Sequence, residues 1–259
     1  FVWDIDFAEI FSGEMHGFDI VIGNPPYVRQ EKVAPPLVPK GEVTNEMKTD
    51  YKDKLENSIR AHFDKRLPQR LDKKSDLYIY FYFHGLALLN PKGTFCFITS
   101  NSWLDVGYGK NLQEFLLESV HVKAIYDNSA KRSFSQADIN TVIVVFSTPL
   151  KTRGDGLLNS ARFVLFKKPF EDVITAENLI EIESVEDALN TDSYRIISVP
   201  QRKLLDEGWE YPDGISEEQK KASNFNIGKY TGNKWGGKYL RAPDIYWDIM
   251  QKNINLVPI

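Results

Sequence analysis

Short apolar runs alternate with helix-like segments through residue 146 of this 259-residue chain. A β-branched run at residues 20–22 stops at Gly23, which predicts a buried strand that ends abruptly. Residues 75–89 predict a helix with Ser75 as its N-cap, ended by the Asn-Pro-Lys-Gly sequence of residues 90–93. This strand and this helix lie on either side of a long polar segment.

The same alternation continues downstream. Residues 94–104 predict a strand that runs into a polar turn, residues 109–119 a helix, and residues 122–126 and 141–146 two further strands. Strands that alternate with helices are typical of a parallel α/β sheet, which binds ligands at the carboxyl ends of its strands. Asn24 directly follows such an end, so we expect a site there.

The pattern weakens after residue 146. Residues 161–166 and 194–199 predict strands, and the acidic stretch at residues 171–190 predicts helical structure. Residues 201–223 are polar and predict a linker.

The sequence Asn24-Pro25-Pro26-Tyr27 carries the most specific chemical signal. Proline fixes φ near about −65° and keeps the preceding residue extended, so the carbonyl of Pro25 is held rigid. The exocyclic amino group of adenine is a poor nucleophile because its lone pair is delocalised into the ring. The Asn24 side chain and the Pro25 carbonyl are two fixed acceptors for its hydrogens, and Tyr27 offers a ring for stacking, worth about 1–3 kcal/mol. The tetrapeptide therefore suits methylation of a planar amino group.

Structural interpretations of these residues stay open. A Pro-Pro pair after a strand is usually only a turn. Leu77 and Phe81 are four residues apart and share one helical face, which in most proteins belongs to the core.

Asn24 to Tyr27, Ser75-Asp76-Leu77-Tyr78-Ile79-Tyr80-Phe81 and the Ile-Thr-Ser-Asn-Ser-Trp-Leu sequence at residues 98–104 resemble motifs of the adenine-N6 DNA methyltransferases of type IIG restriction-modification systems. The resemblance implies a bacterial enzyme with a Rossmann-like, S-adenosylmethionine-dependent methyltransferase sheet that carries one antiparallel edge strand. The connection between residues 126 and 141 lacks a helical pattern, which is consistent with a hairpin that forms this edge strand. It implies methylation of the exocyclic amino group of a flipped adenine in double-stranded DNA, within a restriction-modification or phage-defence system.

The resemblance also implies roles for individual residues. The catalytic residues are Asn24, Pro25, Pro26 and Tyr27, and the residues at the S-adenosylmethionine site are Asn24, Pro26, Leu77 and Phe81. The target base is clamped by Tyr27 and Phe134, and the DNA backbone is contacted by Arg29, Lys131 and Arg132. Phe134 equally suits a loop anchor packed on the core, and the paired basic residues equally suit a solvated loop.

A complete enzyme of this class needs a glycine-rich loop after its first strand and an acidic residue for the cofactor ribose. Only 23 residues precede Asn24, which is too few for these parts, and no later glycine cluster follows a strand directly. We therefore expect a fragment that lacks the N-terminal, cofactor-binding half of the same polypeptide. Its S-adenosylmethionine site is incomplete, and we expect it to be inactive alone.

The expected domain division follows from the same resemblance. Residues 1–200 form the C-terminal part of the catalytic domain, with an insertion at about residues 29–75. Residues 201–259 form a linker and, from the Lys-Trp-Gly-Gly-Lys-Tyr sequence at residues 234–239 onward, the beginning of a target-recognition domain. The parent polypeptide can also contain an endonuclease domain.

Charge is distributed unevenly along the chain. The net charge is −4, yet from Arg29 to Lys74 there are 12 Lys and Arg residues against 8 Asp and Glu residues. This basic insertion can close over DNA phosphates, which supply most non-specific DNA affinity. It can equally be a solvated helical insertion around residues 50–65.

The single cysteine and the four histidines exclude several classes. Cys96 lies in an apolar run and is expected to be buried, which indicates a reducing compartment and argues against cytosine-C5 methylation, a reaction that needs a cysteine nucleophile. The histidines lack metal-ligand spacing, so no metal site is expected. There is no signal peptide and no apolar run near the roughly 18 residues of a membrane span, so we expect a cytoplasmic protein without a membrane partner.

Two rival functions remain. The same tetrapeptide suits methylation of a glutamine amide in a protein, because that planar amine poses the same chemical problem. The chain can also be a non-catalytic DNA-recognition or scaffold fragment in which the motif is a structural turn.

Overall fold

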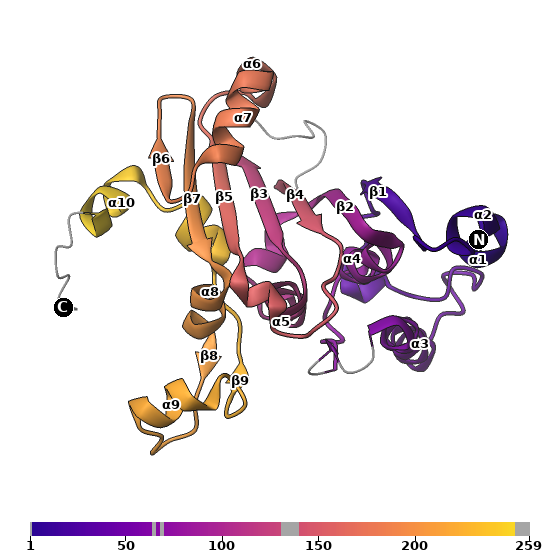
Figure 1. Ribbon diagram of the computed structural model, residues 1–259. Coiled ribbons are helices and arrows are strands. Elements are labelled where there is room, and N and C mark those ends of the chain that lie inside the picture. The colour runs from indigo at the N-terminus through magenta and orange to yellow at the C-terminus, as the bar shows by residue number, and fades with distance from the viewer. Residues whose placement is uncertain (1, 64–65, 68–69, 131–139, 252–259) are drawn as a thin grey trace.

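A seven-stranded mixed sheet with helices packed against it forms the centre of the computed structural model (Figure 1). The structure describes residues 2–63, 66–67, 70–130 and 140–251. The strand order is β1-β2-β4-β3-β5-β7-β6. The strands are β1 (Phe18–Gly23), β2 (Leu89–Ser100), β3 (Val122–Asn128), β4 (Thr141–Ser147), β5 (Ser160–Phe166), β6 (Ala188–Asn190) and β7 (Tyr194–Pro200).

The position of β4 differs from the expected antiparallel edge strand. β4 is antiparallel to both β2 and β3 and lies between them, in the interior of the sheet. β3 and β4 pair in antiparallel fashion, as expected. β4 also pairs with β2, for example at Ser100 and Thr141. This position satisfies the backbone hydrogen bonds of β4 on both sides. β1, β2, β3, β5 and β6 run in one direction, and β4 and β7 run in the other.

Helices α4 (Leu77–Ala87) and α5 (Lys110–Ser119) contribute aromatic and aliphatic side chains to the main core. Tyr82 of α4 packs against Phe95 of β2 with ring centroids 5.6 Å apart, and Phe95 stacks on Phe146 of β4 at 5.7 Å. The hydroxyl groups of Tyr82 and Thr99 share a hydrogen bond at 2.7 Å, so this buried polar group is satisfied. The predicted helices at residues 75–89 and 109–119 are confirmed, with α4 starting and ending two residues inside its predicted bounds.

The predicted burial of the strand at residues 20–22 is wrong for one of its faces. β1 is an edge strand, and Ile20 and Ile22 are 66% and 76% exposed, while Val21 on the opposite face packs against the core. Ile22 pairs with Cys96, which pairs with Val145, so these side chains share one face of the sheet.

Cys96 is half-buried rather than buried, because it lies on this more open face of β2. Burial still raises the pKa of its thiol.

The segment between residues 29 and 75 contains α3 (Asn45–Phe63), preceded by the short helical turn η1 (Gln30–Lys32). The helix expected around residues 50–65 is therefore confirmed as far as Phe63, and it is not fully solvated. Phe63 packs against Phe115 of α5 with ring centroids 4.9 Å apart, which joins the insertion to the main core.

The predicted linker at residues 201–223 is largely folded. It contains α8 (Gln201–Glu207), β8 (Trp209–Glu210) and α9 (Glu217–Ser223), and β8 pairs with β9 (Lys229–Tyr230). Gln201 is buried and its Oε1 accepts a hydrogen bond from the Val122 N–H at 2.9 Å. Trp235 is buried in the main core as well. The division of the chain at residue 200 stays a prediction.

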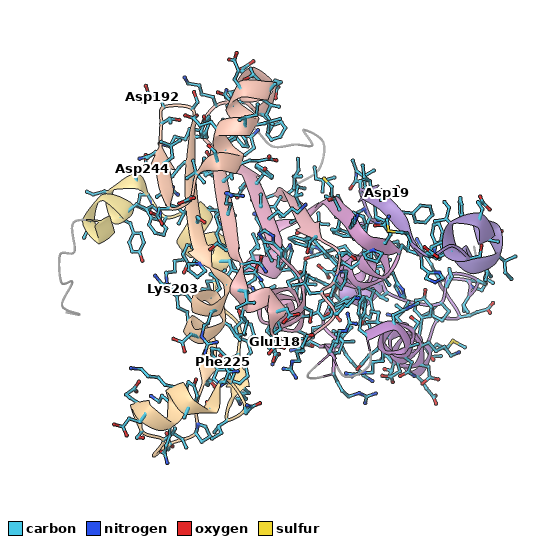
Figure 2. The ribbon with its side chains drawn as sticks, viewed as in Figure 1. Asp19, Glu118, Asp192, Lys203, Phe225 and Asp244 are labelled. Carbon is cyan, nitrogen blue, oxygen red and sulfur yellow. The ribbon has the colours of Figure 1, made fainter. Side chains whose placement is uncertain are left out.

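The remaining elements surround the sheet (Figure 1). The acidic stretch contains α6 (Phe170–Val173) and α7 (Ala176–Ser184), followed by β6, so it is helical only in part. In Figure 2, Asp19 on β1 and Asp244 on α10 (Asp244–Gln251) mark opposite sides of the sheet. Short helices and turns complete the chain: α1 (Trp3–Asp6), α2 (Ala8–Phe11), η3 (Asn101–Leu104), η4 (Gly107–Gly109), η5 (Asp155–Leu158) and η6 (Gly236–Leu240).

Among the residues that the structure describes, no helix combines the length and apolarity needed to cross a membrane. The same residues contain no group of three or more His, Cys, Asp or Glu side chains able to hold a metal ion.

Two buried carboxyl groups lie on α5 (Figure 2 labels Glu118). Arg153 donates to both carboxylate oxygens of Glu118, and its Nη2 lies 3.8 Å from the Glu114 carboxylate. Burial, together with the nearby charge of Glu118, raises the pKa of Glu114 to about 7. Glu114 therefore changes protonation state near neutral pH in the folded protein.

Glu114→Gln is expected to flatten the pH dependence of stability. Folding raises the pKa of Glu114 from 4.5 to about 7, so its contribution is complete below the unfolded value and is lost as the pH rises through the folded value. Between about pH 5 and about pH 8, the free energy of unfolding of the wild type should fall by about 1–3 kcal/mol more than that of the variant. Urea denaturation measures this difference, with substitution of the exposed Glu186 by Gln as the control. Parallel pH profiles for the wild type and Glu114→Gln would refute the assignment.

Candidate functional site

The Asn-Pro-Pro-Tyr loop starts at the carboxyl end of β1, as the sequence predicted. β1 is parallel to β2, and Gly23 pairs with Phe97. A β-carbon at Gly23 would lie only 2.9 Å from Cε1 of Phe97, so glycine allows the Phe97 ring to pack directly under the start of the loop.

The two proposed acceptors lie in a stiff segment and differ in exposure. Asn24 and Pro26 are exposed, whereas Pro25 is buried. The Pro26 carbonyl accepts a hydrogen bond from the Val28 N–H at 3.0 Å, which closes a tight turn. Within the described part of the chain, neither the Asn24 side chain nor the Pro25 carbonyl takes part in a hydrogen bond, and Asn24 is exposed.

Tyr27 is half-buried and its hydroxyl group is fixed on the neighbouring strand. The hydroxyl donates to the carbonyl of Ile98 on β2 at 3.2 Å. Burial raises the pKa of Tyr27, so the phenol stays protonated and remains a donor at neutral pH. The hydrogen bond restricts rotation of the ring, which leaves its orientation defined.

The loop is also attached to the first residues of α4. The Leu77 N–H donates to the Val28 carbonyl at 2.9 Å, and the Gln30 N–H donates to Oδ1 of Asp76 at 2.8 Å. These contacts place Leu77, one of the residues expected at the cofactor site, beside the loop that carries Asn24.

The expected N-cap at Ser75 is wrong. Asp76 is the N-cap of α4, and its side chain makes no capping bond because both its oxygens bind other segments. Ser75 is buried and its hydroxyl group has no hydrogen-bond partner within the described residues. A Ser before an apolar helix is a common capping signal, so the sequence alone did not reveal the different use of Asp76.

Leu77 and Phe81 lie on one face of α4, and Leu77 packs against the main core, as its structural interpretation predicted. Leu77 is half-buried, and Phe81 is 39% exposed, although most of α4 is buried. The structure thus places Leu77 next to the loop of Asn24 and Pro26, and leaves Phe81 partly exposed one helical turn further along α4.

The residues expected to contact DNA are described only in part. Arg29 is exposed and follows Tyr27 by two residues. Lys131, Arg132 and Phe134 lie outside the described residues. β3 ends at Asn128 and β4 begins at Thr141, and β3 runs in the same direction as β1. The last residue of β3, Asn128, and the first residue of β4, Thr141, therefore lie at the same end of the sheet as Gly23, the last residue of β1.

The sheet has the fold of S-adenosylmethionine-dependent methyltransferases of restriction-modification systems. A methyltransferase subunit of a type I restriction-modification system from Streptococcus thermophilus superposes with a TM-score of 0.50 and 16% identity, covering 76% of this chain and 37% of that one. The type IIG restriction endonuclease BpuSI gives a TM-score of 0.50 and 18% identity, covering 73% and 20% of the two chains. These similarities establish the fold class.

Residues 1–134 match the Eco57I restriction-modification methylase family, and the chain belongs to this family. It is 32% identical over 126 residues to the type II methyltransferase M.BstVI of Geobacillus stearothermophilus, covering 49% of this chain and 18% of that protein. It is 32% identical over 112 residues to the type II methyltransferase M.XhoI of Xanthomonas vasicola, covering 43% and 16%. The chain thus spans less than a fifth of these relatives.

Gly23→Ala is expected to lower the free energy of unfolding by about 1–3 kcal/mol, because the added methyl group would displace the buried Phe97 ring. Gly107→Ala is the matched control, since a β-carbon there would meet no atom within 4 Å. Chemical denaturation compares the two variants. Equal stability of both would show that the close packing beneath the loop is not a constraint.

Proposed function

We propose that the protein transfers a methyl group from S-adenosylmethionine to the exocyclic amino group of an adenine flipped out of double-stranded DNA. The observation that carries this proposal is the loop at the end of β1, where Asn24 is exposed and Tyr27 is fixed on β2. Membership of a restriction-modification methylase family favours DNA over a glutamine amide as the substrate. We therefore place the protein in a restriction-modification or phage-defence system of bacteria, in the cytoplasm where the DNA lies.

The mechanism needs two acceptors and one stacking surface. The Asn24 Oδ1 and the Pro25 carbonyl accept the two hydrogens of the amino group and draw its lone pair out of conjugation with the ring. Tyr27 stacks on the base, and its bond to Ile98 keeps the ring in the stacking orientation. When bound, S-adenosylmethionine supplies the electrophilic methyl group. No residue needs to act as a strong base, because the nitrogen loses its proton only after it has become cationic.

Further residues complete the proposed site. Asn24, Pro26, Leu77 and Phe81 form one side of the cofactor site, and Phe134 packs on the flipped base opposite Tyr27. Arg29, Lys131 and Arg132 contact DNA phosphates, where each cation contributes sequence-independent affinity.

The remainder of the cofactor site comes from a preceding part of the same polypeptide. Two observations support this proposal. β1 is an edge strand, and its own residues Ile20 and Ile22 expose their apolar side chains. An exposed apolar edge strand is normally paired or covered, because it otherwise recruits other chains. Further strands paired with β1 would satisfy its free edge, helices connecting these strands would cover Ile20 and Ile22 on their face of the sheet, and the added part would supply the glycine-rich loop that binds the cofactor.

The proposed domain organisation keeps residues 1–200 as the C-terminal part of the catalytic domain and residues 201–259 as a linker and the start of a target-recognition domain. The parent polypeptide can contain an endonuclease domain in addition. In this arrangement, the 259-residue chain alone is inactive.

Asn24→Ala in the full-length polypeptide is expected to reduce the single-turnover rate of DNA methylation by about 100- to 1000-fold, the usual cost of removing a hydrogen-bonding group that acts in the transition state. DNA affinity should change little, because phosphate contacts dominate it. Transfer of a labelled methyl group to DNA measures the rate, and filter binding measures the affinity. Asn226→Ala, at an exposed site near α9, is the control. An unchanged rate for Asn24→Ala would favour the structural-turn alternative.

Calorimetric titration tests the proposed incompleteness of the cofactor site. The isolated 259-residue chain should bind S-adenosylmethionine too weakly to detect at micromolar concentration, because only one wall of the site is present. The full-length polypeptide should bind it measurably under the same conditions. Micromolar binding by the isolated chain would contradict the proposal that a preceding segment completes the site.

A further inference from the structure

We infer that Asp76 is a positioning residue that fixes the Asn-Pro-Pro-Tyr loop against α4, an inference that rests on the proposed function of this loop. Asp76 does not touch the amino group in this account. It acts through the backbone of Gln30, three residues after Tyr27.

Asp76 is the N-cap of α4, but its side chain does not cap the helix. An Asp at this position normally accepts a hydrogen bond from the backbone of the first helical turn, which stabilises the helix by about 1 kcal/mol. Asp76 makes no such bond. Its Oδ1 instead accepts from the Gln30 N–H at 2.8 Å, and its Oδ2 accepts from the Tyr108 hydroxyl at 3.0 Å. The carboxylate thus connects the loop to η4 rather than stabilising its own helix.

Two tyrosine hydroxyl groups form a chain of hydrogen bonds that ends at the Asp76 carboxylate. Because the Tyr108 proton points to Asp76, the Tyr78 hydroxyl donates to Tyr108 across 2.9 Å. Burial raises the pKa of Tyr108 to about 12 and that of Tyr78 further, so both phenols remain donors at neutral pH. The Asp76 carboxylate is therefore held in place from the side of the core.

The side chain of Gln30 is restrained as well, by Lys52. Lys52 of α3 is buried, and its Nζ donates to the Lys73 carbonyl at 2.6 Å and to Oε1 of Gln30 at 3.4 Å. Gln30 is thus bound both by Asp76 at the start of α4, through its backbone, and by Lys52 of α3, through its side chain.

The consequence concerns the acceptors for the amino group. Tyr27 is fixed at its hydroxyl group on β2, and the chain after it is fixed at Val28 and Gln30 on α4. A displacement of about 1 Å in a reacting group costs up to about 100-fold in rate. Release of Gln30 should therefore slow methyl transfer without removing a group that binds cofactor or DNA.

The test compares Asp76→Ala, Asp76→Asn and Ser75→Ala in the full-length polypeptide. Ser75→Ala is the matched control, because its buried hydroxyl group has no partner within the described residues. For Asp76→Ala we expect a single-turnover rate lowered by about 10- to 100-fold, with dissociation constants for S-adenosylmethionine and DNA within about threefold of the wild type. Asp76→Asn keeps one acceptor for Gln30 and should recover most of the rate.

Hydrogen exchange of the Gln30 amide provides a measurement that does not depend on activity. It should be faster in Asp76→Ala than in Ser75→Ala. Equal exchange in the two variants, equal methylation rates, or a rate loss matched by an equal loss of cofactor and DNA binding would each overturn the inference. If the wild type does not methylate DNA, the proposed function fails, while the exchange comparison still decides whether Asp76 fixes the loop.

Tyr108→Phe keeps the test informative if Asp76→Ala does not fold. It removes one donor to the Asp76 carboxylate and leaves the ring in place. We expect a smaller rate loss in the same direction, together with faster exchange of the Gln30 amide. No change in either quantity would count against the inference.

Discussion

The attachment of one loop to two neighbouring elements is the constraint on which the site depends. β1 ends at Gly23, close above the Phe97 ring, and the next residues are bound to β2 through the Tyr27 hydroxyl and to α4 through Val28. Two prolines remove much of the remaining backbone freedom. Asn24 can therefore be exposed without being loosely held, which is what a preorganised acceptor requires.

The sheet supports the Asn-Pro-Pro-Tyr loop on one side of β1 and leaves the other side of β1 uncovered. Inserting β4 between β2 and β3 builds a continuous hydrogen-bonded sheet, and α4 and α5 bury their apolar residues in the main core. β1 lies at the edge, with Ile20 and Ile22 exposed. The Asn-Pro-Pro-Tyr loop thus rests on the well-packed side of β1, whereas the proposed cofactor pocket depends on what lies on its other side.

Local features of the sequence predicted the local structure well. The end of β1 at Gly23 and the helices α4 and α5 follow from periodicity and from glycine and proline positions, whereas the antiparallel pairing of β3 and β4 was implied by the family resemblance. Strand order did not, because the position of β4 inside the sheet depends on pairing between residues distant in sequence. The exposure of Ile20 and Ile22 was also missed, since a β-branched run looks the same at an edge and in the centre of a sheet. The link from Asp76 to Gln30 spans 46 positions and leaves no local pattern.

The product of the reaction tests the central claim most directly. The full-length polypeptide is incubated with double-stranded DNA and S-adenosylmethionine labelled in its methyl group, and the DNA is then digested to nucleosides and separated. If the loop at Asn24 holds the exocyclic amine of a flipped adenine, the label appears in N6-methyladenine. Label in 5-methylcytosine, label in a protein glutamine with none in the DNA, or no transfer at all would contradict the account.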